Sequence, residues 1–310
     1  MKFAFVQEHH GQWPLGMMCR VLRVSRGGYA AWQRRQHQPS LSQQADARLL
    51  LQIKAAHRQG RRTYGSPRVH RALRDQKVRV GCKRVARLMR EAGLRGVCRG
   101  RVKPRTTQAD PRLAVAPNLL ERCFTPCQIG GLNRALCGDI TYVATAQGWL
   151  YLATVQDLYS RRVIGWALSE SLEAELVQKA FERAMQTRHS NRVAGMTCQA
   201  PFKLFHSDRG SQYASRVFKN ALKKHGFVAS MSRQGDGWDN AVAESFFGTY
   251  KSELVEQQPD GRFVTKAQAY RLMADYIENF YNRVRLHSTL DYRSPVAFEL
   301  AHQAGTLSAF

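Results

Sequence analysis

The sequence contains no run of about 18 apolar residues, the shortest that a helix needs to span a bilayer. Residues 1–10 also lack the apolar core of a secretory signal. The seven cysteines are odd in number and irregularly spaced, which argues against a disulfide framework. Zinc at Cys123, Cys127 and Cys137 is an alternative, but no second close Cys or His pair completes four ligands. We therefore expect a cytoplasmic protein without a membrane partner.

Acidic residues are scarce, because 23 Asp and Glu stand against 48 Lys and Arg, a formal net charge of +25. So large an excess favours a polyanion, nucleic acid first, over a neutral metabolite. Residues 1–130 carry 27 Lys/Arg and 6 Asp/Glu, whereas residues 131–310 carry 21 and 17. The basic part can neutralise phosphates, and the nearly balanced part can gather acidic side chains. We infer a binding part followed by a reacting part.

Two short amphipathic helices are predicted in the basic part. The first begins at Ser66-Pro67, a favoured cap and first-turn pair, and the second ends at Gly93. The polar positions of the second helix include Lys83, Arg84, Arg87 and Arg90. This pattern indicates a helix-turn-helix whose second helix enters the major groove, and a weaker pair lies at residues 15–32. The alternative is two ordinary helices with solvated Arg faces.

The second part of the chain predicts an α/β order of elements. Segments of alternating, β-branched composition separated by Gly indicate successive antiparallel strands. The predicted strands are 139–143, 148–157, 161–168 and 202–205, and the predicted helices are 172–185, 214–225, 239–254 and 267–280. In this order one sheet can carry several acidic groups at neighbouring strand ends.

Three carboxylates suit that arrangement. Asp139 lies in the first strand, Asp208 follows a later one, and Glu244 lies on a helix with Asn240 and Lys251 on nearly the same face. Gathered carboxylates repel one another, and hard cations such as Mg²⁺ or Mn²⁺ relieve that repulsion. Two such ions roughly 3.5 to 4 Å apart promote in-line displacement at phosphorus. A single acid among 23 would prove little, because most are solvated.

The sequence around two of these acids is recognisable. Residues 206–213 read His-Ser-Asp-Arg-Gly-Ser-Gln-Tyr, and residues 235–247 read Gly-Asp-Gly-Trp-Asp-Asn-Ala-Val-Ala-Glu-Ser-Phe-Phe, with 35 residues between Asp208 and Glu244. These stretches closely resemble the catalytic core of type-three insertion-sequence transposases, which are related to retroviral integrases. Further similarity lies at residues 64–68, 138–142, 148–166 and 281–295, so the resemblance covers essentially the whole chain.

The resemblance implies an α/β fold, a ribonuclease-H-like integrase core with a mixed five-stranded sheet flanked by helices, preceded by an all-α helix-turn-helix region. We expect the following parts: an N-terminal helical segment (1–40) that resembles a second helix-turn-helix, a helix-turn-helix DNA-binding domain (45–98), a basic linker (99–130), the integrase core (131–260) and a helical extension of the core (261–310). Residues 99–117, without apolar period, predict the linker.

The resemblance also implies metal-dependent DNA strand cleavage and strand transfer at insertion-sequence ends. Asp139, Asp208 and Glu244 are the implied catalytic and metal-binding triad, with two Mg²⁺ or Mn²⁺ ions as cofactors. The family usually has a Trp just upstream of the first Asp, whereas this chain has residues 135–137, Ala-Leu-Cys. That departure affects local packing more than the triad.

The resemblance places Lys251 on the terminal DNA. The other residues that we expect to contact DNA are Asn240, Arg68, Lys83, Arg84, Arg87 and Arg90. The expected partner is double-stranded DNA, both the terminal repeats of the element and its target. We further expect a homo-oligomer on DNA, fusion with or binding to an upstream-frame protein, and a location at the nucleoid of a bacterial cytoplasm.

Several readings stay open. His206 can serve as an auxiliary residue that contacts substrate or a water on the metal, or it can be a structural group. Asp157 is expected to be structural, at a strand turn. The aromatic and basic residues of 280–287 suit either DNA contact or core packing. A DNA-binding regulator with a degenerate core, or a nuclease that cuts without joining, are the alternative functions.

Overall fold

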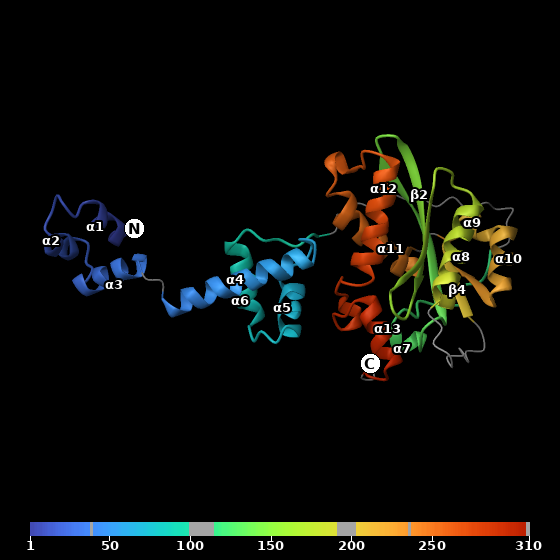
Figure 1. Cartoon of the computed structure of the whole chain (residues 1–310), viewed down its shortest axis with the longest axis horizontal. Helices are drawn as coiled ribbons and strands as arrows, with labels where there is room; N and C mark the ends of the chain where they lie inside the picture. Colours follow the sequence, from blue (N-terminus) through green and yellow to red (C-terminus); the bar gives the residue numbers. More distant parts are fainter. Residues whose placement is uncertain (38–39, 99–114, 191–202, 235–236, 308–310) are drawn as a thin grey trace. The chain divides into compact units, whose positions relative to one another are not determined.

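The computed structural model describes residues 1–37, 40–98, 115–190, 203–234 and 237–307 (Figure 1). The chain forms two compact units. The first comprises Met1–Arg61 and Val69–Arg95, and the second comprises Arg62–Arg68 and Gly96–Phe310. No helix in the described ranges is long and apolar enough to cross a membrane.

Three short helices begin the first unit: α1 (Lys2–Glu8), α2 (Leu15–Val21) and α3 (Arg26–His37). They enclose a small apolar cluster around Val6, Met18, Cys19 and Tyr29. The helix pair predicted within residues 15–32 corresponds to α2 and α3. The Tyr29 hydroxyl donates a hydrogen bond to Gln7 Oε1, so this aromatic side chain is buried with its polar end satisfied.

The helix pair predicted in the basic part is confirmed. The pair is α5 (Ser66–Asp75) and α6 (Cys82–Glu91), and the longer helix α4 (Leu41–Gln59) precedes it. A capping box of Ser40 and Gln43 begins α4. After α6, Gly93 adopts a φ of +67°, and the N–H of Leu94 donates to the carbonyl of Met89, which ends the helix where the glycine predicted.

A mixed five-stranded sheet is the centre of the second unit, as the resemblance implied. Its strands, in the order β3-β2-β1-β4-β5, are β1 (Ala135–Thr145), β2 (Gly148–Asp157), β3 (Val163–Ser169), β4 (Lys203–Ser207) and β5 (Phe227–Met231). The first three strands are antiparallel neighbours, and β4 and β5 run parallel to β1. This topology brings the end of β4 beside β1, with the end of β5 on the far side of β4.

One face of the sheet is covered by α8 (Ala174–Ser190), α9 (Ser211–Ala214) and α10 (Arg216–Lys224) (Figure 1). Phe181 of α8 contacts Phe205 of β4 and Phe218 of α10 edge-to-face. Gly165 of β3 permits the close approach of α8, because a Cβ there would lie 2.2 Å from the carbonyl oxygen of Ala180. This apolar layer holds the sheet, and hence its acidic residues, in place.

The other face is covered by the later helices, α11 (Ala241–Tyr250) and α12 (Lys266–Ala274) (Figure 1). The predicted helices 239–254 and 267–280 continue past α11 and α12 as the π-helices η2 (Lys251–Val255) and η4 (Asp275–Tyr281). The two π segments meet where the Tyr276 hydroxyl donates to Glu253 Oε2.

The remaining elements of this unit are α7 (Pro126–Ile129), α13 (Pro295–Gln303) and the 3₁₀ turns η1 (Gly237–Asn240), η3 (Pro259–Gly261) and η5 (Ser288–Leu290).

Candidate active site

Asp139 lies in the middle of β1, on the face that α11 covers. Alternation along the strand puts it on the same side as the buried residues Thr141, Val143 and Thr145. Its Oδ1 accepts a hydrogen bond from the N–H of Ile140 at 2.8 Å. The residue is half-buried, so its carboxylate has lost part of its hydration.

Asp208 follows the last residue of β4. Cys137 of β1 pairs with His206 of β4 in a parallel ladder, and continuing that register brings Asp208 beside Asp139. Its Oδ1 accepts a hydrogen bond from the N–H of Gly210 at 3.0 Å. The adjacent strand end is held by the Ser232 N–H, which donates to the Ser207 carbonyl.

Glu244 lies in the first turn of α11, a helix that packs against β1. The charges of Asp208 and Glu244, together with burial as the largest cause, raise the pKa of Asp139 well above its ordinary value. The positive charge of Lys251, directly after α11, acts in the opposite direction. The structure therefore brings the three predicted carboxylates and the predicted lysine into one electrostatic environment.

Lys251 and Asn240 flank Glu244 along the chain. Lys251 is half-buried, and loss of hydration lowers the pKa of its ammonium while Asp139 raises it. Asn240 is buried, and among the described residues no hydrogen-bond partner meets its Oδ1. As it stands, Lys251 is better placed than Asn240 to reach a phosphate.

The donor chemistry fits a hard divalent cation. Within the described ranges, no three His, Cys, Asp or Glu side chains converge closely enough to hold a metal as they stand. Carboxylates that repel one another are expected to move together only when a cation neutralises them. The oxygen-only set of Asp139, Asp208 and Glu244 is the kind that Mg²⁺ or Mn²⁺ prefers. Burial raises the pKa of the Cys137 thiol to about 12, which opposes the thiolate that zinc needs.

His206 is buried between two hydroxyl groups. Its Nδ1 lies 2.9 Å from Ser230 Oγ, and its Nε2 lies 3.2 Å from Ser232 Oγ. Burial lowers the pKa of the imidazole to about 4, so the ring is neutral near pH 7. These contacts suit a group that holds β4 to β5 more than one that reacts with substrate.

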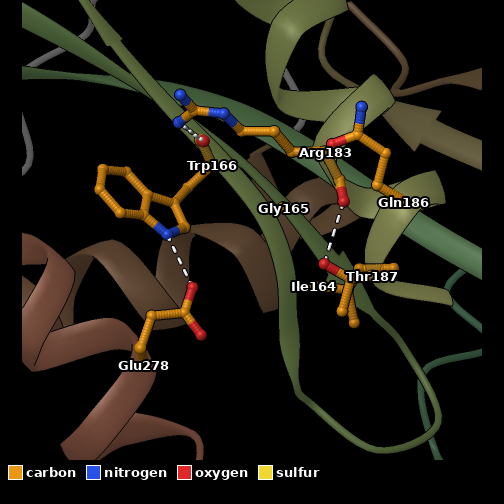
Figure 2. Close-up of a pocket in the computed structure, with 7 residues that line it drawn as sticks. All are labelled: Ile164, Gly165, Trp166, Arg183, Gln186, Thr187 and Glu278. Carbon is orange, nitrogen blue, oxygen red and sulfur yellow. Dashed lines mark hydrogen bonds between the residues drawn. The ribbon is translucent and has the colours of Figure 1, made fainter. Parts of the chain in front are cut away.

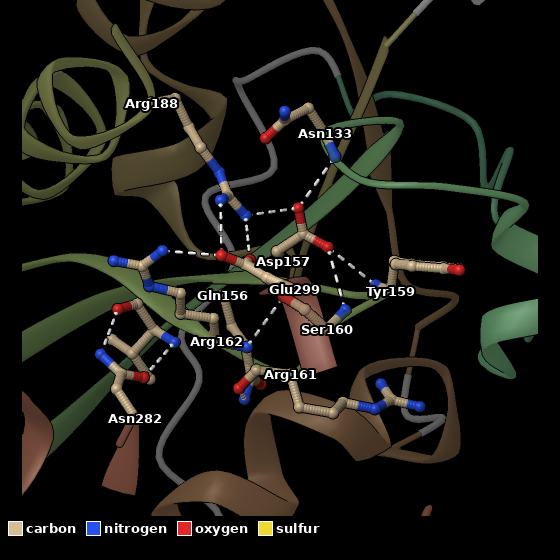
Figure 3. A network of polar contacts seen from close by, with 11 residues as sticks. Asn133, Gln156, Asp157, Tyr159, Ser160, Arg161, Arg162, Arg188, Asn282 and Glu299 are labelled. Atoms are coloured by element: carbon tan, nitrogen blue, oxygen red, sulfur yellow. Dashed lines mark hydrogen bonds and ion pairs between the residues drawn. The ribbon is translucent and has the colours of Figure 1, made fainter. Parts of the chain in front are cut away.

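Asp157 is the centre of a separate polar network (Figure 3). Its carboxylate accepts hydrogen bonds from the N–H groups of Asn133, Tyr159 and Ser160, and from Arg188. Arg188 and Arg162 also bind Glu299 of α13. The contacts give Asp157 the structural role at the strand turn that the sequence indicated.

The basic residues predicted on α6 are exposed, and two of them have acidic partners. Arg84 Nε donates to Asp46 Oδ1 at 2.7 Å, and Arg87 Nη2 donates to Asp46 Oδ2 at 2.6 Å. Lys83 and Arg90 are also exposed. Arg68, in the second unit, donates from Nε to the carbonyl of Leu286.

The stretch 280–287 is mainly interior. Phe280, Tyr281 and His287 are buried, and Arg285 forms a buried ion pair with Glu253 at 2.7 Å. Core packing therefore accounts for these side chains, and only Arg283 of the basic residues there is exposed.

A surface hollow lies away from the carboxylates, between β3, α8 and η4 (Figure 2). It measures about 480 Å³. Trp166 Nε1 donates to Glu278 across it, and Arg183 donates to the Trp166 carbonyl. Glu278, the acidic residue that lines this hollow, already accepts a hydrogen bond from Trp166, and none of the three predicted carboxylates lines it. The hollow is therefore not the predicted metal site.

Asp239 has hydrogen-bond partners that the sequence did not predict. This buried carboxylate, five residues before Glu244, is bound by Asn118, Arg122 and Arg233. Asn118 and Arg122 fall in the predicted linker 99–130, of which residues 99–114 lie outside the described structure. Asn118 and Arg122 lie more than a hundred residues from Asp239, so no local pattern in the sequence indicates that they bind it.

Known families match most of the chain. Two models described as "Integrase core domain" match residues 131–236 and 225–295, and one described as "HTH-like domain" matches residues 43–102. An insertion element IS600 protein of 31 kDa from Shigella sonnei is 42% identical over 92% of this chain and 99% of its own length. The transposase InsF for insertion sequence IS3A from Escherichia coli K12 is 37% identical over 96% of this chain and 98% of its own length.

Solved structures give weaker likenesses. The catalytic core domain of BIV integrase matches with a TM-score of 0.38 and 16% identity, over 56% of this chain and 97% of that one. The catalytic domain of the Mos1 mariner transposase gives 0.39 and 14%, over 57% and 86%. The family assignment rests on the sequence relatives.

A helix-turn-helix domain joined to an integrase-type core defines a DNA-binding polynucleotidyl transferase. The chain belongs to the IS3-type insertion-sequence transposases, a DDE family that cleaves DNA and transfers strands.

Proposed function

We propose that this transposase cuts and joins phosphodiester bonds at the ends of its element with two Mg²⁺ or Mn²⁺ ions held by Asp139, Asp208 and Glu244. The observation that carries the proposal is geometric: the β1–β4 register brings Asp208 beside Asp139, and Glu244 lies on α11, which packs against β1; burial and the two other carboxylates also raise the pKa of Asp139. Neighbouring carboxylates repel one another, so the binding of a cation between them is favourable.

Two bound ions would activate the attacking oxygen and stabilise the leaving oxygen of an in-line displacement. The chain supplies the geometry. β1 and the end of β4 hold Asp139 and Asp208 with the backbone N–H groups of Ile140 and Gly210. Packing of α11 on β1 presents Glu244 over the face of the sheet that carries Asp139.

Lys251 is proposed to bind a phosphate of the terminal DNA. Its half-buried ammonium has lost part of its hydration, so an anionic phosphate would replace water at low cost. The exposed side chains of Lys83, Arg84, Arg87 and Arg90 are proposed to contact the terminal repeats through the helix-turn-helix. Asn240 would need to turn outward to join them, since its amide is now buried.

Replacing Asp208 by Asn should reduce strand cleavage to background, because a neutral amide binds Mg²⁺ much more weakly than a carboxylate. Affinity for the element ends should stay within a few-fold of the parent. Labelled end duplexes with Mg²⁺ measure cleavage, and fluorescence anisotropy measures binding. Asp260→Asn, at a side chain that is 80% exposed, is the matched control and should cut normally.

The same assay separates the competing functions. Joined products show a transposase, cut ends without joining show a nuclease, and mobility shifts without chemistry show a regulator. Cleavage by Asp208→Asn at the parent rate would remove this residue from the mechanism.

Assembly is part of the proposal. We propose that the chain acts as a homo-oligomer on DNA, because two ends must be held together for transposition. Fusion with or binding to the upstream-frame protein would add further DNA contacts. Cross-linking with and without end duplexes, read by mass photometry, should show a DNA-dependent oligomer.

A further inference from the structure

Asp239 is a buried carboxylate with a concentrated set of donors. Its two oxygens accept hydrogen bonds from Arg233 Nε at 2.9 Å, Arg233 Nη2 at 3.0 Å, Arg122 Nε at 2.7 Å and Asn118 Nδ2 at 3.0 Å. The backbone N–H of Arg233 adds a further bond at 2.9 Å. These contacts, those of Arg233 first, hold the pKa of Asp239 well below its usual range.

The donors come from two segments of the chain. Asn118 and Arg122 lie more than a hundred residues before Asp239, and Arg233 lies six residues before it. Asn118 and Arg122 precede α7, and Arg233 follows β5. Asp239 itself lies in η1, the turn that leads into α11. The carboxylate therefore ties the beginning of the Glu244 helix to the edge of the sheet.

The end of β5 lies beside the end of β4, which Asp208 follows, because Met231 pairs with Ser207. The Leu119 N–H donates to Ser230 Oγ, which also contacts His206 Nδ1 at 2.9 Å. Arg209, next to Asp208, donates from Nε to the Ser232 carbonyl at 2.8 Å. Hydrogen bonds, joined by the peptide links Asn118–Leu119 and Ser232–Arg233, thus connect Asp239 through the end of β5 to the end of β4.

We propose that Asp239 is a positioning residue, which fixes Glu244 relative to Asp208 by means of Arg122 and Arg233 and so sets the affinity of the site for divalent cations. The inference rests on the proposed metal-binding role of those two carboxylates. Groups that orient metal ligands are known to change metal affinity or activity about 10–100-fold when removed.

Two other roles fit the contacts less well. A side chain as buried as Asp239 cannot itself meet DNA, and its charge would repel phosphate. A helix cap is also not its role, because Asn240 occupies the N-cap position of α11 and no side chain there makes a capping hydrogen bond. What remains is the link between the start of α11 and the sheet edge.

Asp239→Asn tests the proposal, because the amide keeps the shape of the carboxylate and removes its charge. In the full chain with end duplexes, we expect the Mn²⁺ concentration for half-maximal cleavage to rise about tenfold. Electron paramagnetic resonance of free Mn²⁺ should show the same loss of affinity without any turnover. The dissociation constant for DNA should stay within a few-fold of the parent.

Glu299→Gln is the matched control. Glu299 is also a buried carboxylate with two arginine partners, Arg162 and Arg188, but its helix α13 carries none of the proposed ligands. This variant should lower the melting temperature and leave the Mn²⁺ titration at the parent position. Arg233→Gln should shift the titration as Asp239→Asn does, and the double variant should shift it no further.

An unshifted Mn²⁺ titration for Asp239→Asn, or a shift equal to that of Glu299→Gln, overturns the proposal. Should Asp239→Asn fail to fold, Arg233→Gln decides alone, since the Arg233 side chain is 57% exposed and its truncation leaves no buried cavity. Failure of the proposed function looks different: the parent would then bind Mn²⁺ no better than Asp208→Asn does.

Discussion

A buried carboxylate needs a cation or several donors to offset its lost hydration. Asp239 and Glu299 have arginine partners, and those contacts keep the pKa of each carboxyl below its ordinary range. Asp139 instead lies in the field of two other carboxylates, and its pKa is raised. The raised pKa of Asp139, unlike the lowered pKa of Asp239 and Glu299, comes in part from neighbouring carboxylates, whose charge a bound cation would offset.

His287 gives a prediction about pH. Burial and the positive charges of Arg285, Arg68 and Arg161 lower the pKa of its ring well below the ordinary value, and Tyr281 packs on it edge-to-face. Below about pH 6.5 the unfolded chain binds a proton that the folded chain does not, so the free energy of unfolding falls as the pH drops. Between pH 6.5 and 5.5 the loss should be up to about 1 kcal/mol.

Denaturant unfolding at pH 7.5, 6.5 and 5.5 measures this effect. His287→Gln cannot bind the proton, so its free energy of unfolding should depend less on pH than that of the parent. Identical pH dependence in the two proteins would show that His287 is not the group responsible.

At the scale of elements, the long periodic segments were predictable from sequence. The three antiparallel strands, α8 and the α5–α6 pair lie within a few residues of their predicted bounds, because their apolar period is carried by many residues. β5 was not located, since its sequence Phe-Val-Ala-Ser-Met lacks the alternation of apolar and polar residues that marks a strand. The π-helices η2 and η4 were read as α-helix, because the buried contact of Glu253 with Tyr276 is tertiary.

The packing of α8 on β3 gives a prediction about stability. Gly165→Ala would place a Cβ 2.2 Å from the Ala180 carbonyl oxygen, so the helix must move away from the sheet. Overpacking of this kind costs about 1–3 kcal/mol. Thermal unfolding followed by circular dichroism should show a lower transition for the core. Gly27→Ala, where no described atom lies within 4 Å of the added Cβ, should leave that transition unchanged.

At the scale of the whole molecule, the charge division predicted a basic binding part, and the helix-turn-helix lies there. The proposed triad was also found from sequence, because its motifs are local around Asp208 and Glu244. The contacts of Asp239 were not, since Arg122 lies 117 residues away. Sequence thus indicated the carboxylates that are proposed to react, but not the groups that are proposed to hold them in place.

Salt dependence of DNA binding tests the assignment of α6. Arg87→Gln should weaken binding and reduce the slope of log affinity against log salt by about 1, as expected for one lost phosphate contact. Asp46→Asn should strengthen binding, because it removes the negative charge that pairs with Arg84 and Arg87. Lys179→Gln, an exposed charge on α8, is the control. A Lys179→Gln effect equal to that of Arg87→Gln would contradict the assignment.

The most direct measurement is a crystal structure of the chain with an element-end duplex and Mn²⁺, with the ions located by anomalous scattering. The account predicts two peaks beside the scissile phosphate, with carboxylate oxygens of Asp139, Asp208 and Glu244 as ligands. Peaks bound by other side chains, or a complex in which these three carboxylates stay apart around an uncoordinated phosphate, would contradict it.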